Sequence, residues 1–189
     1  MSSAVSTLGS EPVLLESDAL YVSTTQLSEA TYHWALILTD ANCIATRHHW
    51  HEQRPRRAEA IEGYGRQTIQ PKSLTGRVVL GYFKISHFSA PPPGVFEQIC
   101  EGTFETSYTT VVDNRQHGIT CRTFVLNVLA ELCARGYVGG WRESGKSIQG
   151  FVDNLEQTIK IASNQMDSAY LTRFLSHRIL TWSSSVVVV

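Results

Sequence analysis

The sequence predicts a single α+β domain in which an antiparallel β-sheet packs against a cysteine-bearing helix and further C-terminal helices. Two runs, 31–38 and 77–88, are rich in β-branched and aromatic residues, as is typical of strands. Between Cys121 and Arg135 the apolar residues instead recur at helical spacing, and Gly136 follows as a stop signal. These patterns together predict the fold class.

The first run is expected to form a β-hairpin with 43–50, because Asp40 and Asn42 in the connecting segment favour a tight turn. Small polar residues at the start predict a flexible N-terminal segment over 1–10, followed by one domain over 11–182 and a tail over 183–189. Further elements are predicted as strands at 12–20, 21–26 and 108–112, a loop at 54–70, a short helix at 95–100, a glycine-rich link at 139–150, and helices at 151–162 and 167–180.

Composition excludes several classes of partner. A formal net charge of -1 over 189 residues gives no long-range field for nucleic acid, and no stretch approaches the ~20 apolar residues of a membrane span. The four cysteines form no C-x-x-C pair, and the first ten residues lack a secretory signal, so a reducing, cytoplasmic location is expected. The oligomeric state is left open. The cysteines are Cys43, Cys100, Cys121 and Cys133.

Cys121 is the candidate nucleophile. It opens the predicted helix directly after a loop that contains Gly118. Backbone N–H groups and the helix dipole at such a position favour the thiolate, which attacks electrophilic carbon. The alternative is a small buried hydrophobic residue, as we expect for Cys133 in the middle of the helix.

His33 is the candidate base, because it stands at the entry of a predicted buried strand, between the bulky Tyr32 and Trp34. A polar side chain there must face a cleft or a partner. An imidazole near Cys121 can accept the thiol proton and return it to a leaving group. The alternative is a strand-edge histidine that water or a backbone carbonyl satisfies.

Two segments resemble known motifs. The run His33 to Leu38, followed by an Asp-containing turn and a histidine-bearing strand, resembles the histidine motif of the permuted papain-like superfamily, which includes the lecithin retinol acyltransferase-like and NlpC-like cysteine enzymes. The run Cys121 to Val125 resembles the cysteine motif of that group, in the same His-before-Cys order. The resemblance covers 32–51 and 118–132.

The resemblance implies that Cys121 forms a thioester with an acyl donor, that His33 acts as base, and that a polar residue on the next strand orients the imidazole. The family's orienting position lies near Thr46, and His48 would share its strand face, so His48 is predicted to fill the role. Trp34 is predicted to contact the substrate. Arg122 is predicted to do the same, although it and Thr120 depart from the family pattern.

The sequence therefore predicts a cysteine-dependent hydrolase or acyltransferase that acts on an ester, thioester or amide of a small molecule or peptide, without a cofactor or metal. One alternative is a non-hydrolytic binding or cyclisation module in which Cys121 is structural. A second is nucleotide binding, because the segment Gly140 to Ser147 matches G-x-x-x-x-G-K-[ST]. No strand is predicted before that segment, so Ser147 is instead expected to cap the next helix. His49 and His51 could share a strand face toward a metal, but a zinc site needs three or four ligands.

Overall fold

The structure is a computed structural model that describes residues 12–28, 31–53, 62–73, 77–104, 107–177 and 183–189. In this part of the chain, six strands form one mixed sheet in the order β4-β3-β2-β1-β5-β6, accompanied by four helices, so the predicted α+β class is confirmed. The elements are β1 (Leu20–Ser28), β2 (Thr31–Thr39), β3 (Ala45–Glu52), β4 (Glu62–Ile69), β5 (Val79–Lys84), α1 (Val95–Gly102), α2 (Val111–Gln116), α3 (Cys121–Ala134), α4 (Ile148–His177) and β6 (Ser185–Val188).

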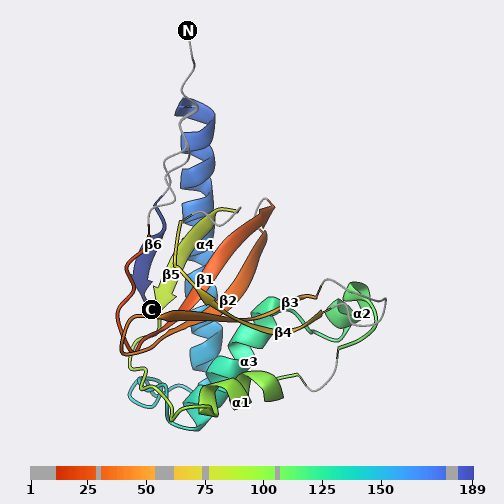
Figure 1. The fold of residues 1–189 in the computed structure, drawn as a ribbon, viewed down its shortest axis with the longest axis vertical. Coiled ribbons are helices and arrows are strands. Elements are labelled where there is room, and N and C mark those ends of the chain that lie inside the picture. The colour runs from red at the N-terminus through yellow and green to blue at the C-terminus, as the bar shows by residue number, and fades with distance from the viewer. Residues whose placement is uncertain (1–11, 29–30, 54–61, 74–76, 105–106, 178–182) are drawn as a thin grey trace.

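The predicted hairpin is confirmed as β2 and β3. Its turn forms because the Asp40 carboxylate accepts hydrogen bonds from the backbone N–H groups of Asn42 at 2.9 Å and Ile44 at 2.8 Å. The register pairs Leu36 with His48, and the paired stretch of β2 begins there and ends at Thr39. Before this stretch β2 pairs with β1 alone among the described strands, and Figure 1 shows β3 and β4 diverging from β1 and β2.

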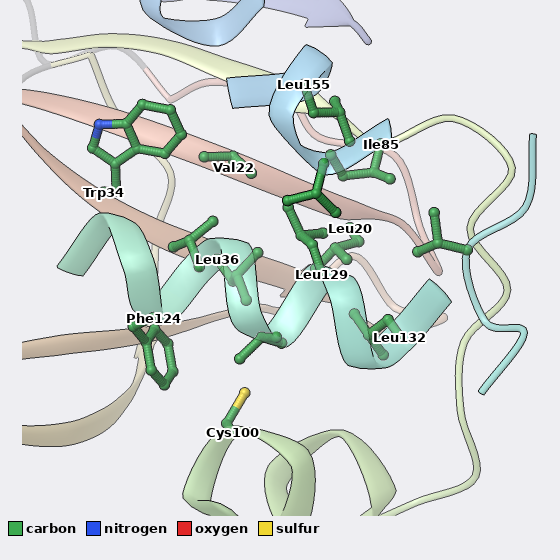
Figure 2. Packing of buried hydrophobic residues seen from close by; sticks show 14 of the residues in the cluster. Leu20, Val22, Trp34, Leu36, Ile85, Cys100, Phe124, Leu129, Leu132 and Leu155 are labelled. Carbon is green, nitrogen blue, oxygen red and sulfur yellow. The ribbon is translucent and has the colours of Figure 1, made fainter. Parts of the chain in front are cut away.

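The main core lies between one face of the sheet and the helices. Apolar side chains of β1, β2 and the end of β5 meet α3, with α1 and α4 closing the two sides (Figure 2). The helical spacing of the α3 residues produces this buried stripe, which confirms the predicted helix. Figure 2 labels Leu20, Val22, Trp34, Leu36, Ile85, Cys100, Phe124, Leu129, Leu132 and Leu155 in this cluster.

The opposite face of the sheet has a smaller apolar cluster around Tyr21, Ile37 and Tyr82. Residues before β1 cover part of this cluster. A hydrogen bond of 2.6 Å from the Thr39 hydroxyl to the backbone carbonyl of Glu16 holds them there. The remainder of this face is polar at its β2 and β3 positions. The two faces therefore differ sharply in chemistry, which decides where each candidate site residue lies.

The predicted loop at 54–70 is wrong over 62–69, where β4 pairs antiparallel with β3. Gly63 and Gly65 lie inside this edge strand. A Cβ atom at Gly65 would overlap with the imidazole of His51 on the neighbouring strand and would lie tightly against that of His49. The glycine at position 65 is thus explained by the close approach of neighbouring side chains rather than by a turn. Residues 54–61 lie outside the described part of the chain, as does the predicted flexible segment 1–10.

Three further predictions, all in the second half of the chain, differ from the structure. The predicted strand at 108–112 is a turn leading into α2, because the Thr110 side chain caps that helix by accepting from the Asp113 N–H at 3.0 Å. The two predicted C-terminal helices are one helix of 30 residues, α4. The predicted tail contains β6, which pairs parallel with β5 and makes the sheet mixed rather than purely antiparallel. None of the described helices has the length and apolar character needed to cross a membrane.

Candidate functional site: a cavity beside Cys121

Cys121 is the first residue of α3, as predicted. Gly118 adopts the left-handed conformation, with φ of 72°, and turns the chain into the helix. Thr120 then caps the helix, since its hydroxyl accepts from the Thr123 N–H at 2.9 Å and the Thr123 hydroxyl contacts the Thr120 N–H at 2.9 Å. This capping box fixes the helix start and hence the place of the thiol.

An ion pair between the buried Glu62 and the partly exposed Arg115 holds the loop before Cys121. The Glu62 carboxylate, at the start of β4, accepts from Arg115 at 2.6 and 2.9 Å and from the Asn114 side chain at 2.8 Å. The Arg115 guanidinium also donates to the backbone carbonyl of Ile119 at 2.5 Å. Since Glu62 is buried, these bonds compensate its desolvation and join the edge strand to the Cys121 loop.

Burial raises the pKa of the Cys121 thiol above that of a free cysteine. A backbone hydrogen bond from Trp34, the positive charge of Arg115 and a backbone hydrogen bond from Arg122 act in the opposite direction. Desolvation exceeds these effects. Burial therefore opposes the activation expected from the helix position, because a thiol pKa rises when the sulfur is buried in apolar surroundings.

A cavity of about 360 Å³ lies beside the thiol, between β2, α3 and α4. Its apolar wall comes from the start of β2 and the end of β1, and its polar wall comes from the start of α3, the loop before it and α4. The predicted substrate contacts Trp34 and Arg122 both line it together with Cys121. The cavity is also lined by Leu27, Tyr32, Arg115, Lys160 and Asn164.

Positive charge dominates the polar wall. Arg122 and Lys160 share one carboxylate, that of Glu156, at 3.3 and 3.6 Å. Arg115 has its own partner in Glu62. These three cations line the cavity whereas their carboxylate partners do not, and the N-terminus of α3 adds the positive end of its dipole at the same place. Such a wall favours an anionic group on a ligand.

Tyr32 extends from β2 toward α4, where its hydroxyl donates to the Asn164 side chain at 2.6 Å and lies 3.4 Å from an Asp167 carboxylate oxygen. Burial, the Asp167 charge and the hydrogen bond from the Tyr32 hydroxyl to Asp167 raise the Tyr32 pKa to about 12. Tyr32 thus stays protonated at neutral pH and cannot serve there as a general base.

The structure does not bring His33 to Cys121. Side chains alternate along β2, so Tyr32 and Trp34 face the helices whereas His33 faces the other side of the sheet. There the His33 Nε2 atom lies 2.8 Å from His49 Nδ1. Burial, with the charge of Arg47, lowers the His33 pKa to about 4, so the ring is neutral at physiological pH. The expected Cys121–His33 contact is not formed.

His48 does not orient His33 either, since the two imidazoles lie on opposite faces of the sheet. The pairing of His48 with Leu36 places His48 on the helix-facing side. Its Nδ1 atom lies 2.7 Å from the Tyr64 hydroxyl, and its ring contacts the edge of Phe96 at 4.9 Å between centroids. In the described part of the chain, no histidine hydrogen-bonds to Cys121.

The segment that matches the phosphate-loop pattern is a turn before α4. The residue before it, Gly139, follows Val138, whose only sheet-like pairing within the described residues is an isolated bridge to Phe88. Ser147 accepts from the Gly150 N–H at 3.1 Å, which confirms the expected helix cap. The strand that should precede a phosphate loop is therefore not present at this position.

The described residues contain no group of three or more His, Cys, Asp or Glu side chains placed to hold a metal ion. His49 and His51 do share a strand face, with their rings stacked at 4.2 Å. The chain matches no protein-family model, no curated protein and no solved structure. The resemblance to the permuted papain-like superfamily therefore stays a prediction from two short segments.

Proposed function

We propose that the protein binds a small molecule with an anionic group and a short apolar body in the cavity beside Cys121. The observation that carries this proposal is that three cations, those of Arg115, Arg122 and Lys160, line the cavity and no carboxylate of the described residues does. The apolar wall of Leu27, Tyr32 and Trp34 would take the rest of the ligand. A pocket of this size, mostly apolar with a few convergent charges, has the composition of small-molecule sites.

Hexanoate is a suitable probe, because its carboxylate matches the cations and its chain matches the apolar wall. We expect hexanoate to shift the backbone amide resonances of Trp34 and Arg122 in an NMR titration, and hexanol to shift them less. Arg122→Gln or Lys160→Gln should each weaken binding about fivefold, the effect of one partly exposed charge. Glu156→Gln should strengthen binding, since it removes the carboxylate that competes for both cations.

Arg135→Gln is the matched control, because Arg135 lies at the opposite end of α3 and pairs with Glu131 on the surface. It should leave hexanoate affinity unchanged. Equal affinities for hexanoate and hexanol, or a Glu156→Gln variant that binds hexanoate more weakly, would contradict the proposal.

A second candidate function is acyl transfer through Cys121. The observation that favours it is the position of the Cys121 thiol on the wall of a cavity that a substrate can enter, close enough to the backbone N–H groups of Trp34 and Arg122 for these to lower the thiol pKa. In this scheme the thiolate attacks an ester carbonyl carbon, the carbon–oxygen bond to the leaving group breaks, and a thioester remains on Cys121. The thiol proton goes to solvent rather than to His33, and the two N–H groups support the oxyanion.

p-Nitrophenyl hexanoate tests this second function. We expect one hexanoyl group to appear on Cys121 by intact-mass and peptide analysis, with release of one p-nitrophenolate per chain. Because the raised thiol pKa leaves little thiolate at neutral pH, the acylation rate should still be rising with pH above the pKa of a free thiol. His33→Ala should leave the rate unchanged. If the hexanoyl group is found on the exposed Cys43 and not on Cys121, Cys121 is no nucleophile and the binding function alone stands.

A further inference from the structure

A second cavity, of about 410 Å³, lies on the sheet face that points away from α3, at the end of β4. His48 faces the helices, so Arg47 beside it on β3 faces the opposite side. Arg47 lines this cavity together with Gln67, its direct partner on β4, and with Lys72 from the segment after β4. We call it the Arg47 cavity. It has no described lining residue in common with the Cys121 cavity, so its ligand is a separate question from the function proposed above.

The charge on the wall of the Arg47 cavity is positive. Arg47 and Lys72 are cations, and none of the described lining residues is acidic. Neither cation forms an ion pair with a carboxylate in the part of the chain that the structure describes. Both charges therefore attract an anion, and no carboxylate of the described residues has to be displaced first.

The environment of the Arg47 guanidinium is a second observation that points to an anion. Arg47 is partly buried, and burial lowers its pKa, as expected for a cation that has lost water. Its Nη2 atom donates to Gln67 Oε1 at 2.7 Å, but its solvent-excluded Nε–H group has no acceptor among the described residues. A partly desolvated and incompletely hydrogen-bonded charge is unfavourable until an opposite charge comes close to it.

Tyr82 fixes the wall of the cavity without neutralising it. Its hydroxyl donates to the Lys72 carbonyl at 3.0 Å and accepts from the Lys72 N–H at 3.2 Å, which holds the Lys72 backbone against the sheet. Burial raises the Tyr82 pKa to about 12, so the phenol is uncharged at physiological pH. Tyr82 therefore supplies no negative charge to Arg47.

The remaining lining groups indicate a compact anion with several oxygen atoms. Because a guanidinium can only donate, the Gln67 atom that faces Arg47 is the carbonyl oxygen, which leaves the Gln67 amide N–H groups for a ligand. Ile69 is the single apolar residue among the described lining residues, and it packs against the cluster around Tyr21. The cavity thus offers several donors and, unlike the Cys121 cavity, no apolar wall for a hydrocarbon chain.

We propose that the Arg47 cavity binds the phosphate group of a small phosphomonoester, whose oxygens pair with Arg47 and Lys72 and accept from the Gln67 amide. Arginine and lysine are both common phosphate ligands, and arginine contacts two oxygens at once. A phosphomonoester carries a charge of about -1.5 to -2 at neutral pH, which matches the two cations. A phosphodiester has a smaller charge and fewer free oxygens, so it fits the site less well.

Methyl phosphate is the probe, and dimethyl phosphate is the comparison because it has the diester group of nucleic acids and phospholipids. In an NMR titration of the full chain, methyl phosphate should shift the backbone amide resonances of Gln67 and Lys72. Dimethyl phosphate should bind about fivefold more weakly, the effect of one partly exposed charge. Arg47→Met and Lys72→Gln should each weaken the binding of methyl phosphate by about the same factor.

Urea denaturation separates a ligand role of Arg47 from a structural role. Arg47→Met removes an unpaired charge, so without ligand the variant should unfold at the same urea concentration as the unmodified protein or at a higher one. Methyl phosphate should raise the urea midpoint of the unmodified protein, because it binds only the folded state. It should leave the midpoint of the variant in place. A variant that unfolds at a lower urea concentration would show that Arg47 is structural.

Arg66→Gln is the matched control. Arg66 precedes Gln67 on β4, so its side chain points to the other face of the sheet, where it lines a different cavity. The substitution removes the same charge as Arg47→Met and should leave methyl phosphate affinity unchanged. The proposal is overturned if Arg66→Gln weakens binding as much as Arg47→Met does, or if dimethyl phosphate binds as tightly as methyl phosphate.

The position of the resonance shifts separates this proposal from the one for the Cys121 cavity. Methyl phosphate that shifts the amides of Trp34 and Arg122 but not those of Gln67 and Lys72 would overturn the assignment of the Arg47 cavity. Arg122→Gln removes a cation of the Cys121 cavity and should leave the shifts of Gln67 and Lys72 unchanged. The two proposals therefore fail separately.

Discussion

Phe124→Ala is expected to lower the free energy of unfolding by about 4 kcal/mol, in the range for loss of a fully buried phenylalanine. Phe124 is completely buried in the first turn of α3, and the rings of Tyr64, Phe104 and Trp50 surround it at 5.9, 6.3 and 6.4 Å between centroids. Truncation leaves a cavity where β3, β4 and α3 meet. Urea denaturation monitored by circular dichroism measures the change.

The matched control is Ile161→Ala on α4, where the isoleucine is largely exposed. It should change the unfolding free energy by less than about 0.5 kcal/mol. A loss below about 1 kcal/mol for Phe124→Ala, comparable to a surface substitution, would contradict the packing of α3 against the diverging strands.

Arg115→Met is expected to destabilise the protein by about 2–3 kcal/mol, because among the described residues it leaves the buried Glu62 carboxylate with Asn114 as its single side-chain partner. The figure is below that for a fully buried pair, since the Arg115 side chain is 43% exposed. The variant also frees the Ile119 carbonyl, so the loop before Cys121 loses its support. Denaturation with urea again gives the energy.

A double-mutant cycle separates the ion pair from simple loss of packing. Glu62→Gln in the Arg115→Met background should restore part of the stability, because an amide costs less to bury than an uncompensated carboxylate. Strictly additive losses in the double variant would show that Glu62 and Arg115 are not coupled.

The local elements could be predicted from the sequence. The hairpin follows from Asp40 and Asn42 between two strand-like runs, and α3 follows from the spacing of apolar residues that ends at Gly136. Both signals lie within a few residues of the structure that they specify. The sequence predicts two helices over 151–162 and 167–180, whereas α4 is continuous and the polar side chains of Ser163 and Asn164 between them hydrogen-bond to Thr24 and Tyr32 on the sheet.

Local sequence patterns do not predict whether His33 lies on the face of the sheet that the helices cover. Register around the Asp40 turn already pairs position 36 with 48, and therefore places 33 on the same face as 49 and 51. What the sequence alone does not state is which of the two faces the helices cover. That depends on contacts between residues far apart in the chain, such as Tyr32 with Asn164.

The pKa of the Cys121 thiol could not be predicted from local sequence patterns either. The position of Cys121 at a helix N-terminus could be read from the sequence, but its pKa depends on how deeply the surrounding elements bury the sulfur. The cavity itself was also missed, because Lys160 and Arg115 come from segments that no short motif connects to Cys121. The cationic wall appears only when β2, α3 and α4 are assembled.

The most direct test of the Cys121 cavity as a ligand site is protection of the thiol from alkylation. Each cysteine is followed by peptide mass spectrometry during reaction with iodoacetamide, and the exposed Cys43 serves as the internal reference. We predict that hexanoate slows alkylation of Cys121 in a saturable manner, leaves Cys43 unaffected, and does so equally in the His33→Ala variant. Alkylation of Cys121 at an unchanged rate in saturating hexanoate would contradict the account.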